Sequence, residues 1–125
     1  MTYVDGFVAA VPVANKDRFV AHAQKADTIF TDMGALRVVE CWADEVPDGK
    51  LTDFRRAVQA QPDEAVVFSW VEWPDKATRD AAMSKMEELA KTDDRINQDT
   101  NPMPFDGARM IFGGFRRVIE LTPEG

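Results

Sequence analysis

The chain has 125 residues, 45% of them hydrophobic and 30% charged, and a formal net charge of −7. This length suits one domain, residues 1–125, and no apolar run approaches the roughly 20 residues that span a bilayer. The acidic balance repels phosphate backbones and anionic lipids, so we expect no nucleic-acid partner and no membrane partner. The single cysteine, Cys41, excludes an internal disulfide and a multi-cysteine metal centre, and it fits a cytoplasmic protein.

The first residues predict a strand followed by a long helix. Residues 3–11 are rich in Val, Phe and Ala, and Pro12 closes them. Asn15 is a good N-cap for a helix over residues 16–33, which Gly34 ends. Helical spacing relates the apolar residues of this segment, which are Phe19, Ala23, Ala26, Phe30 and Met33.

The middle of the chain predicts a second strand and an irregular excursion. Residues 36–43 hold β-branched and aromatic side chains typical of a strand. Residues 44–64 have turn chemistry around Pro47 and Gly49. Thr52 is a suitable cap for a short helix that ends near Gln59.

The most informative segment is the predicted third strand, residues 65–73, which ends at Pro74. Alternate side chains of a strand point to opposite faces. One face therefore carries Val66, Phe68, Trp70 and Glu72, and the other carries Val67, Ser69, Val71 and Trp73. Because both faces are largely apolar, both need a cover, and a partner subunit is the simplest second cover for so short a chain.

The remaining residues predict a helix from Pro74 or Asp75 to about Lys91, an ordered loop, and a fourth strand over residues 109–118. In this strand Gly113 and Gly114 indicate either a close backbone approach or a bulge. The order β-α-β, excursion, β-α-β predicts an α+β ferredoxin-like protomer with a four-stranded antiparallel sheet and both helices on one face. Pairing two bare sheet faces gives a homodimer, the dimeric α/β barrel.

The bare face is the predicted site. Placing the most apolar side chains under the helices assigns Val39 and Cys41 to the helix side, together with Val4 and Val8. The opposite face then collects Tyr3, Asp5, Phe7, Glu40, Trp42, Phe68, Trp70 and Glu72. A one-residue slip in register would reverse these assignments. Two interpretations, which are compatible, remain open: a dimer interface in which the carboxylates pair with arginines, or a cleft for a small molecule.

Three carboxylates are candidates for proton transfer: Glu72, Glu40 and Asp5. A carboxylate among aromatic side chains has its pKa raised by desolvation, and Glu72 is the first choice because it lies near Trp70 and Trp73. The alternative for Glu72 is a side chain that points to solvent near the end of the strand. The predicted ligand-binding residues are Tyr3, Phe7, Trp42, Phe68, Trp70 and Arg55. For Arg55 and its neighbour Arg56, a solvated helix flank is the alternative to an anion contact.

His22 is the only histidine, and on the predicted helix it borders the apolar stripe. A packed or capped residue is the more common outcome for such a histidine than a catalyst. No spacing in the sequence supports a metal site or a cofactor fingerprint, so we expect no bound metal and leave any cofactor open.

Five ordered motifs carry a family resemblance. They are Tyr3-Val4-Asp5-Gly6-Phe7, Glu40-Cys41-Trp42, Thr52-Asp53-Phe54-Arg55-Arg56-Ala57-Val58, Phe68-Ser69-Trp70-Val71-Glu72-Trp73-Pro74 and Met103-Pro104-Phe105-Asp106-Gly107. With them the chain resembles the bacterial family known as domain of unknown function 1428, over nearly its full length. The resemblance implies the dimeric α/β-barrel group, which includes monooxygenases, haem-degrading enzymes, isomerases and binding proteins. No motif matches the haem-ligand pattern, and fold analogy does not transfer an activity.

Two functions follow as hypotheses. The first is a protein that binds a small uncharged or cationic organic molecule in the aromatic and carboxylate-lined cleft, with or without catalysis. The second is a structural or interaction protein whose sheet face is only a dimer core. RNA binding ranks third, because the chain has no basic stripe.

Overall fold

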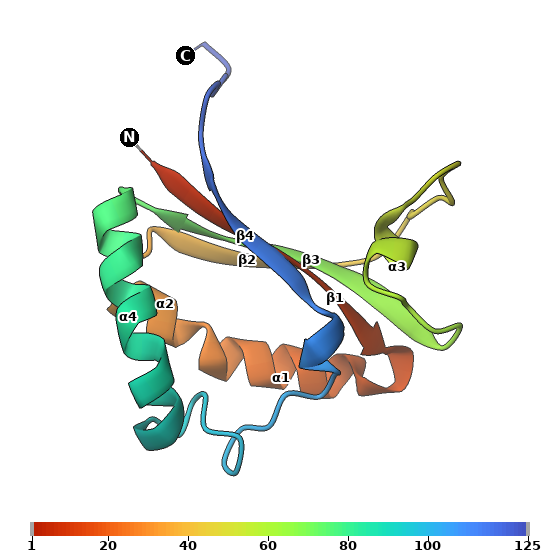
Figure 1. Ribbon diagram of the computed structural model, residues 1–125, viewed down its shortest axis with the longest axis horizontal. Coiled ribbons are helices and arrows are strands. Elements are labelled where there is room, and N and C mark those ends of the chain that lie inside the picture. The colour runs from red at the N-terminus through yellow and green to blue at the C-terminus, as the bar shows by residue number, and fades with distance from the viewer. Residues whose placement is uncertain (1, 125) are drawn as a thin grey trace.

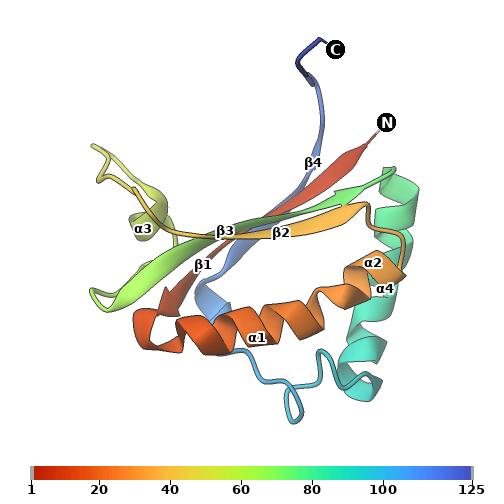
Figure 2. The same cartoon turned by 180° about the vertical axis from the view of Figure 1, so that it is seen from behind.

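The computed structural model describes residues 2–124 and contains one four-stranded antiparallel sheet in the order β2-β3-β1-β4. The strands are β1 (Tyr3–Pro12), β2 (Arg37–Trp42), β3 (Glu64–Trp73) and β4 (Ile111–Arg116). The helices α1 (Lys16–Ala26), α2 (Thr28–Asp32) and α4 (Lys76–Thr92) cover one face, here called the helix face (Figures 1 and 2). This arrangement confirms the predicted α+β, ferredoxin-like fold. None of its helices has the length and hydrophobicity of a membrane span within the described residues.

The core lies between the helices and the two central strands. β1 and β3 pair over ten residues, so that Tyr3 faces Trp73, Asp5 faces Val71 and Ala9 faces Val67 on the helix face. All of these side chains are at least nine-tenths buried. The opposite face, here called the far face, is only partly covered: Phe68, Ile111 and Phe115 remain 46%, 45% and 62% exposed.

The register corrects part of the predicted face assignment. For β3 the prediction is confirmed, because Phe68, Trp70 and Glu72 lie on the far face. For β1 and β2 it is wrong by one residue. The side chains that lie on the helix face instead are Tyr3, Asp5, Phe7, Val38, Glu40 and Trp42. Two physical reasons explain the error: Asp5 is accepted in the core because polar partners surround it, and β2 is an edge strand whose rim tolerates a carboxylate.

Two helix starts depend on aspartate caps. Asp53 accepts a hydrogen bond from the Arg56 amide at 2.8 Å and begins the short helix α3 (Phe54–Ala57), so the predicted cap Thr52 is wrong by one position. Asp75 accepts from the Thr78 amide at 2.7 Å and begins α4. Both follow the usual preference for a short polar acceptor at this position.

Asn15 has a different role from the one predicted. Its side chain makes no cap hydrogen bond to α1, which follows a 3-10 turn over Val13–Asn15. The Asn15 amide instead donates to the Pro104 carbonyl at 2.9 Å. It therefore fastens the segment after α4 to the start of α1.

The predicted helix over residues 16–33 is interrupted at Asp27. The Phe30 amide bonds to the Asp27 carbonyl at 3.1 Å, a tighter i to i+3 contact, and α2 begins at Thr28. Asp27 itself has helical dihedrals, φ −71° and ψ −17°. Asp27 therefore lies at the junction between α1 and α2.

The segment of residues 93–110 returns along α1, as the pale blue loop beneath that helix in Figure 1 shows. Arg95 pairs with Asp32 at 2.5 Å and with Asp93 at 2.8 Å. The Asn101 amide donates to the His22 carbonyl at 3.3 Å, and Phe105 packs against Phe19 with ring centroids 6.0 Å apart. These contacts close the side of the core that the sheet does not cover.

Candidate functional site

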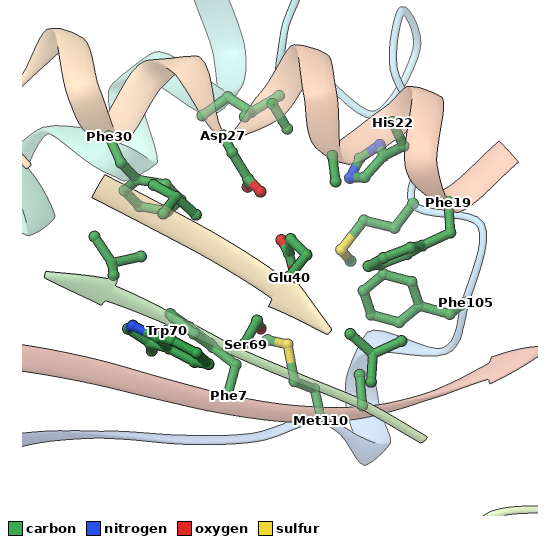
Figure 3. A pocket seen from close by; sticks show the side chains of 18 of the residues that line it. Phe7, Phe19, His22, Asp27, Phe30, Glu40, Ser69, Trp70, Phe105 and Met110 are labelled. Atoms are coloured by element: carbon green, nitrogen blue, oxygen red, sulfur yellow. The ribbon is translucent and has the colours of Figure 1, made fainter. Parts of the chain in front are cut away.

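An apolar hollow lies between α1 and the helix face of the sheet, and we call it the α1 pocket. Its volume is about 290 Å³. Figure 3 shows α1 above, the strands below and side chains converging from both. Its apolar walls come from every layer of the fold and include Phe7, Phe19, Ala23, Ala26, Phe30, Val38, Val67, Met86, Ile96, Met103, Phe105 and Met110.

Two carboxyl groups face each other across this pocket. Asp27 descends from the break after α1, and Glu40 rises from the edge strand β2, so that their side chains point toward one another (Figure 3). Burial, a hydrogen bond to Glu40 and repulsion by the Glu40 charge raise the pKa of Asp27 to about 9. A buried carboxyl group beside a second acidic side chain ionises only at a high free-energy cost, so Asp27 keeps its proton at neutral pH.

Two further polar side chains line the same pocket. His22 comes from α1, and its Nδ1 is buried without a hydrogen-bond partner among residues 2–124. Ser69 lies on β3 directly opposite Glu40 in the sheet register and is 8% exposed. A buried polar atom without a partner costs free energy, so Nδ1 is a contact that a bound molecule would satisfy.

Of the three predicted carboxylates, only Glu40 lines the α1 pocket. Glu72 lies on the far face, where Oε2 accepts from Arg37 at 2.6 Å and from Trp70 at 2.9 Å. Desolvation is the largest single effect and acts to raise its pKa. Yet the hydrogen bonds from Trp70 and Arg37, together with the Arg37 charge, outweigh it and lower the pKa of Glu72. The predicted raised pKa is therefore wrong, because the sequence does not show the paired arginine.

Asp5 belongs to a buried structural cluster. Its Oδ2 accepts from Trp73 Nε1 at 2.9 Å, and its Oδ1 pairs with Arg79 of α4 at 2.9 Å. The Arg79 guanidinium lies 5.4 Å from the centre of the Tyr3 ring. Hydrogen bonding to Asp5 raises the pKa of Arg79. All of these groups are satisfied by one another, which leaves none for a ligand.

The predicted ligand-binding residues are not brought together by the structure. Phe7 lines the α1 pocket, and Trp42 packs on Phe19 at its outer rim, with centroids 6.1 Å apart. Phe68 and Trp70 pack together on the far face, 5.8 Å apart, although Trp70 also borders the pocket. Arg55 donates to the carbonyls of Glu64 and Gln61 at 2.8 and 2.7 Å, so it holds the turn before β3.

Sequence reasoning missed Asp27. It lies four residues after Ala23 and three before Phe30, within the apolar stripe of the helix, and an acidic residue in that stripe is the signal that could have revealed it. His22 was judged a packed residue, and the structure places it in the pocket wall. Among residues 2–124, no three His, Cys, Asp or Glu side chains are grouped so as to hold a metal ion.

Fold and site together define a ferredoxin-like protein with an apolar pocket under its first helix. A solved structure of similar fold is titled a dimeric ferredoxin-like protein from an uncultured marine organism, with a TM-score of 0.57, 12% identity, and coverage of 96% of this chain and 98% of that one. The chain belongs to the family described as "Protein of unknown function (DUF1428)", whose model matches residues 2–107. Relatives named "Uncharacterized protein YbaA", from Escherichia coli K12 and Shigella flexneri, are 55% identical over 120 residues, which is 96% of this chain and 99% of each relative.

Proposed function

We propose that the protein is a single-domain homodimer that binds a small organic molecule, uncharged or cationic, in the α1 pocket. The observation that carries this proposal is the Asp27–Glu40 pair inside an apolar cavity of about 290 Å³. Ligand pockets typically combine apolar walls with a few convergent polar groups and a perturbed pKa. The walls, the pair and His22 supply these three features.

The charge of the pocket favours an uncharged or cationic ligand over an anionic one. Beside the protonated Asp27 the pocket contains the acidic side chain of Glu40, and the whole chain carries a net charge of −7. An anionic ligand would be repelled by both. A neutral molecule with one hydrogen-bond donor or carbonyl group, or a small cation, could hydrogen-bond to the Asp27–Glu40 pair and to His22 Nδ1 without electrostatic repulsion.

The far face supports the homodimer. Phe68, Ile111 and Phe115 are strongly exposed on it, and exposed apolar patches of this kind mark interfaces. A second copy would cover these side chains by pairing sheet on sheet. A protein whose far face is only a dimer core remains the alternative function, and it predicts that no ligand enters the α1 pocket.

A thermal-shift screen of small neutral and cationic aromatic compounds tests the proposal. Ala23 lines the pocket and is 7% exposed, whereas Ala21 of the same helix is exposed, so Ala23→Leu fills the cavity and Ala21→Leu is its matched control. A ligand of the pocket should raise the melting temperature of the wild type and of Ala21→Leu but not of Ala23→Leu. Equal shifts in all three proteins would place the ligand elsewhere and refute the proposal.

A further inference from the structure

The Asp27–Glu40 pair lies where the α1 pocket meets a more open groove. This second hollow, of about 550 Å³, runs over α1, α2 and β2 at the edge of the sheet. Both hollows are lined by Asp27 and Glu40, and also by Phe19, Ala23 and Val38. A molecule that enters from the groove therefore passes both carboxyl groups before it reaches the apolar interior.

The cations near the pair are held by other groups. Lys16 Nζ lies 5.4 Å from the centre of the Trp42 ring, and Arg37 pairs with Glu72 at 2.6 Å. His22 is the third titratable side chain of the pocket wall, and it lies on α1, the helix that ends just before Asp27. Glu40 thus lies at the edge of an apolar cavity and faces the protonated Asp27, and a facing pair of carboxyl groups can supply a base and an acid to one ligand.

We propose that the α1 pocket catalyses proton transfer at a carbon next to a carbonyl group in a small apolar molecule, with Glu40 as the base and Asp27 as the acid. This inference rests on the proposed binding function. A carboxyl group at the edge of the cavity can take a proton from a bound molecule, and a neighbouring neutral acid stabilises the oxygen that gains charge.

The proton balance closes without a cofactor. Glu40 takes the proton from carbon, the electron pair of the C–H bond forms the C=C bond of the enol, and the carbonyl oxygen receives the Asp27 proton. The pair then still holds one proton, now on Glu40. Return of that proton to the same or another carbon, with the enol proton returned to Asp27, restores the enzyme and releases the original molecule or its isomer.

The test uses 5-nitrobenzisoxazole, a neutral probe of this reaction type. A base removes its C3 proton, the N–O bond breaks, and a coloured cyanonitrophenolate is released. The wild type should turn it over, Glu40→Gln should lower kcat/KM at least about tenfold, consistent with the usual contribution of a general base, and added formate should restore part of the rate in Glu40→Ala. Glu45→Gln, an exposed residue just after β2, is the matched control and should keep the full rate.

Binding is measured separately with 5-nitroindazole, which has nearly the same shape but does not react. If it binds the wild type and not Ala23→Leu while Glu40→Gln reacts as fast as the wild type, the proton-transfer inference is overturned and the pocket stands. If it does not bind and the probe is not turned over, both fail. Circular dichroism of Glu40→Gln and Glu40→Ala confirms that a lost rate comes from folded protein.

Discussion

The proton on Asp27 makes the stability of this protein depend on pH, and one substitution can remove that dependence. Asp27→Asn keeps the shape of the side chain and remains neutral at every pH. It therefore leaves the contact with Glu40 in place and abolishes the ionisation of residue 27. Comparison of this variant with the wild type isolates the free energy that the Asp27 proton contributes to folding.

The direction of this pH dependence follows from the raised pKa of Asp27. Because the pKa of Asp27 is about 9 in the folded protein and the ordinary pKa of an aspartate is 3.8, the folded state binds the proton more tightly than the unfolded state. The stabilisation is complete below the unfolded pKa and is lost as pH rises through the folded one. Each pKa unit corresponds to about 1.4 kcal/mol. Water entry from the open groove reduces the full value, so we expect the wild type to lose about 1–4 kcal/mol relative to Asp27→Asn between about pH 5 and pH 9.

Urea unfolding at several pH values measures this difference. Asp17→Asn, an exposed aspartate in the first turn of α1, serves as the control and should follow the wild type at every pH. A gap between wild type and Asp27→Asn that stays constant from pH 5 to pH 9 would refute the reasoning, because it would mean that Asp27 is already ionised in the folded protein at the lower pH.

Three further predictions concern the fold and the assembly. Arg79→Met leaves the 3%-exposed Asp5 without its cation and should lower the free energy of unfolding by about 3–5 kcal/mol. Lys85 is exposed, so Lys85→Met is the control and should change the free energy of unfolding little. Similar urea midpoints for the two variants would contradict this prediction. Gly114→Ala would place a Cβ against the Tyr3 hydroxyl and should lower the free energy of unfolding by about 1–3 kcal/mol. Gly6→Ala, with 3.8 Å to its nearest neighbour, is the milder control, and an equal loss in both would count against this packing. Wild type should sediment with twice the 14.0 kDa mass of one chain, and Phe68→Glu on the far face should sediment as a monomer. Phe112→Glu, on the helix side of β4, is the control and should remain a dimer. If both variants remain dimers, the far face is not the interface.

The fold was accessible from the sequence because its signals are local. Alternation along β3, the apolar spacing of α1 and the proline after Trp73 each depend on neighbouring residues, and together they predict the order of the elements. The faces of β1 and β2 were not accessible in this way. Asp5 lies in the core because Arg79, 74 residues later, and Trp73, 68 residues later, neutralise and bond it. Placing only apolar side chains in the core takes no account of such distant polar partners.

The site was accessible only in part, for the same reason. Glu40 was a candidate from its own sequence, but its partner Asp27 becomes meaningful only when the helix break and the sheet register bring the two carboxyl groups together. Glu72 shows the opposite case. Its aromatic neighbours in sequence favoured a raised pKa, and the hydrogen bonds from Trp70 and from Arg37 on the adjacent strand reverse the direction. Titration behaviour depends on contacts across the fold, so local sequence ranks such residues poorly.

Carbon-13 NMR of side-chain carboxyl groups gives the most direct measurement of the proton in the α1 pocket. Resonances of Asp27 and Glu40 are assigned with Asp27→Asn and Glu40→Gln and followed across pH. The carboxyl carbon of Asp27 should keep the chemical shift of a protonated acid at pH 7 and change only as the pH approaches about 9. A change complete by pH 5 would show two ionised carboxylates at neutral pH and would contradict the acid–base site.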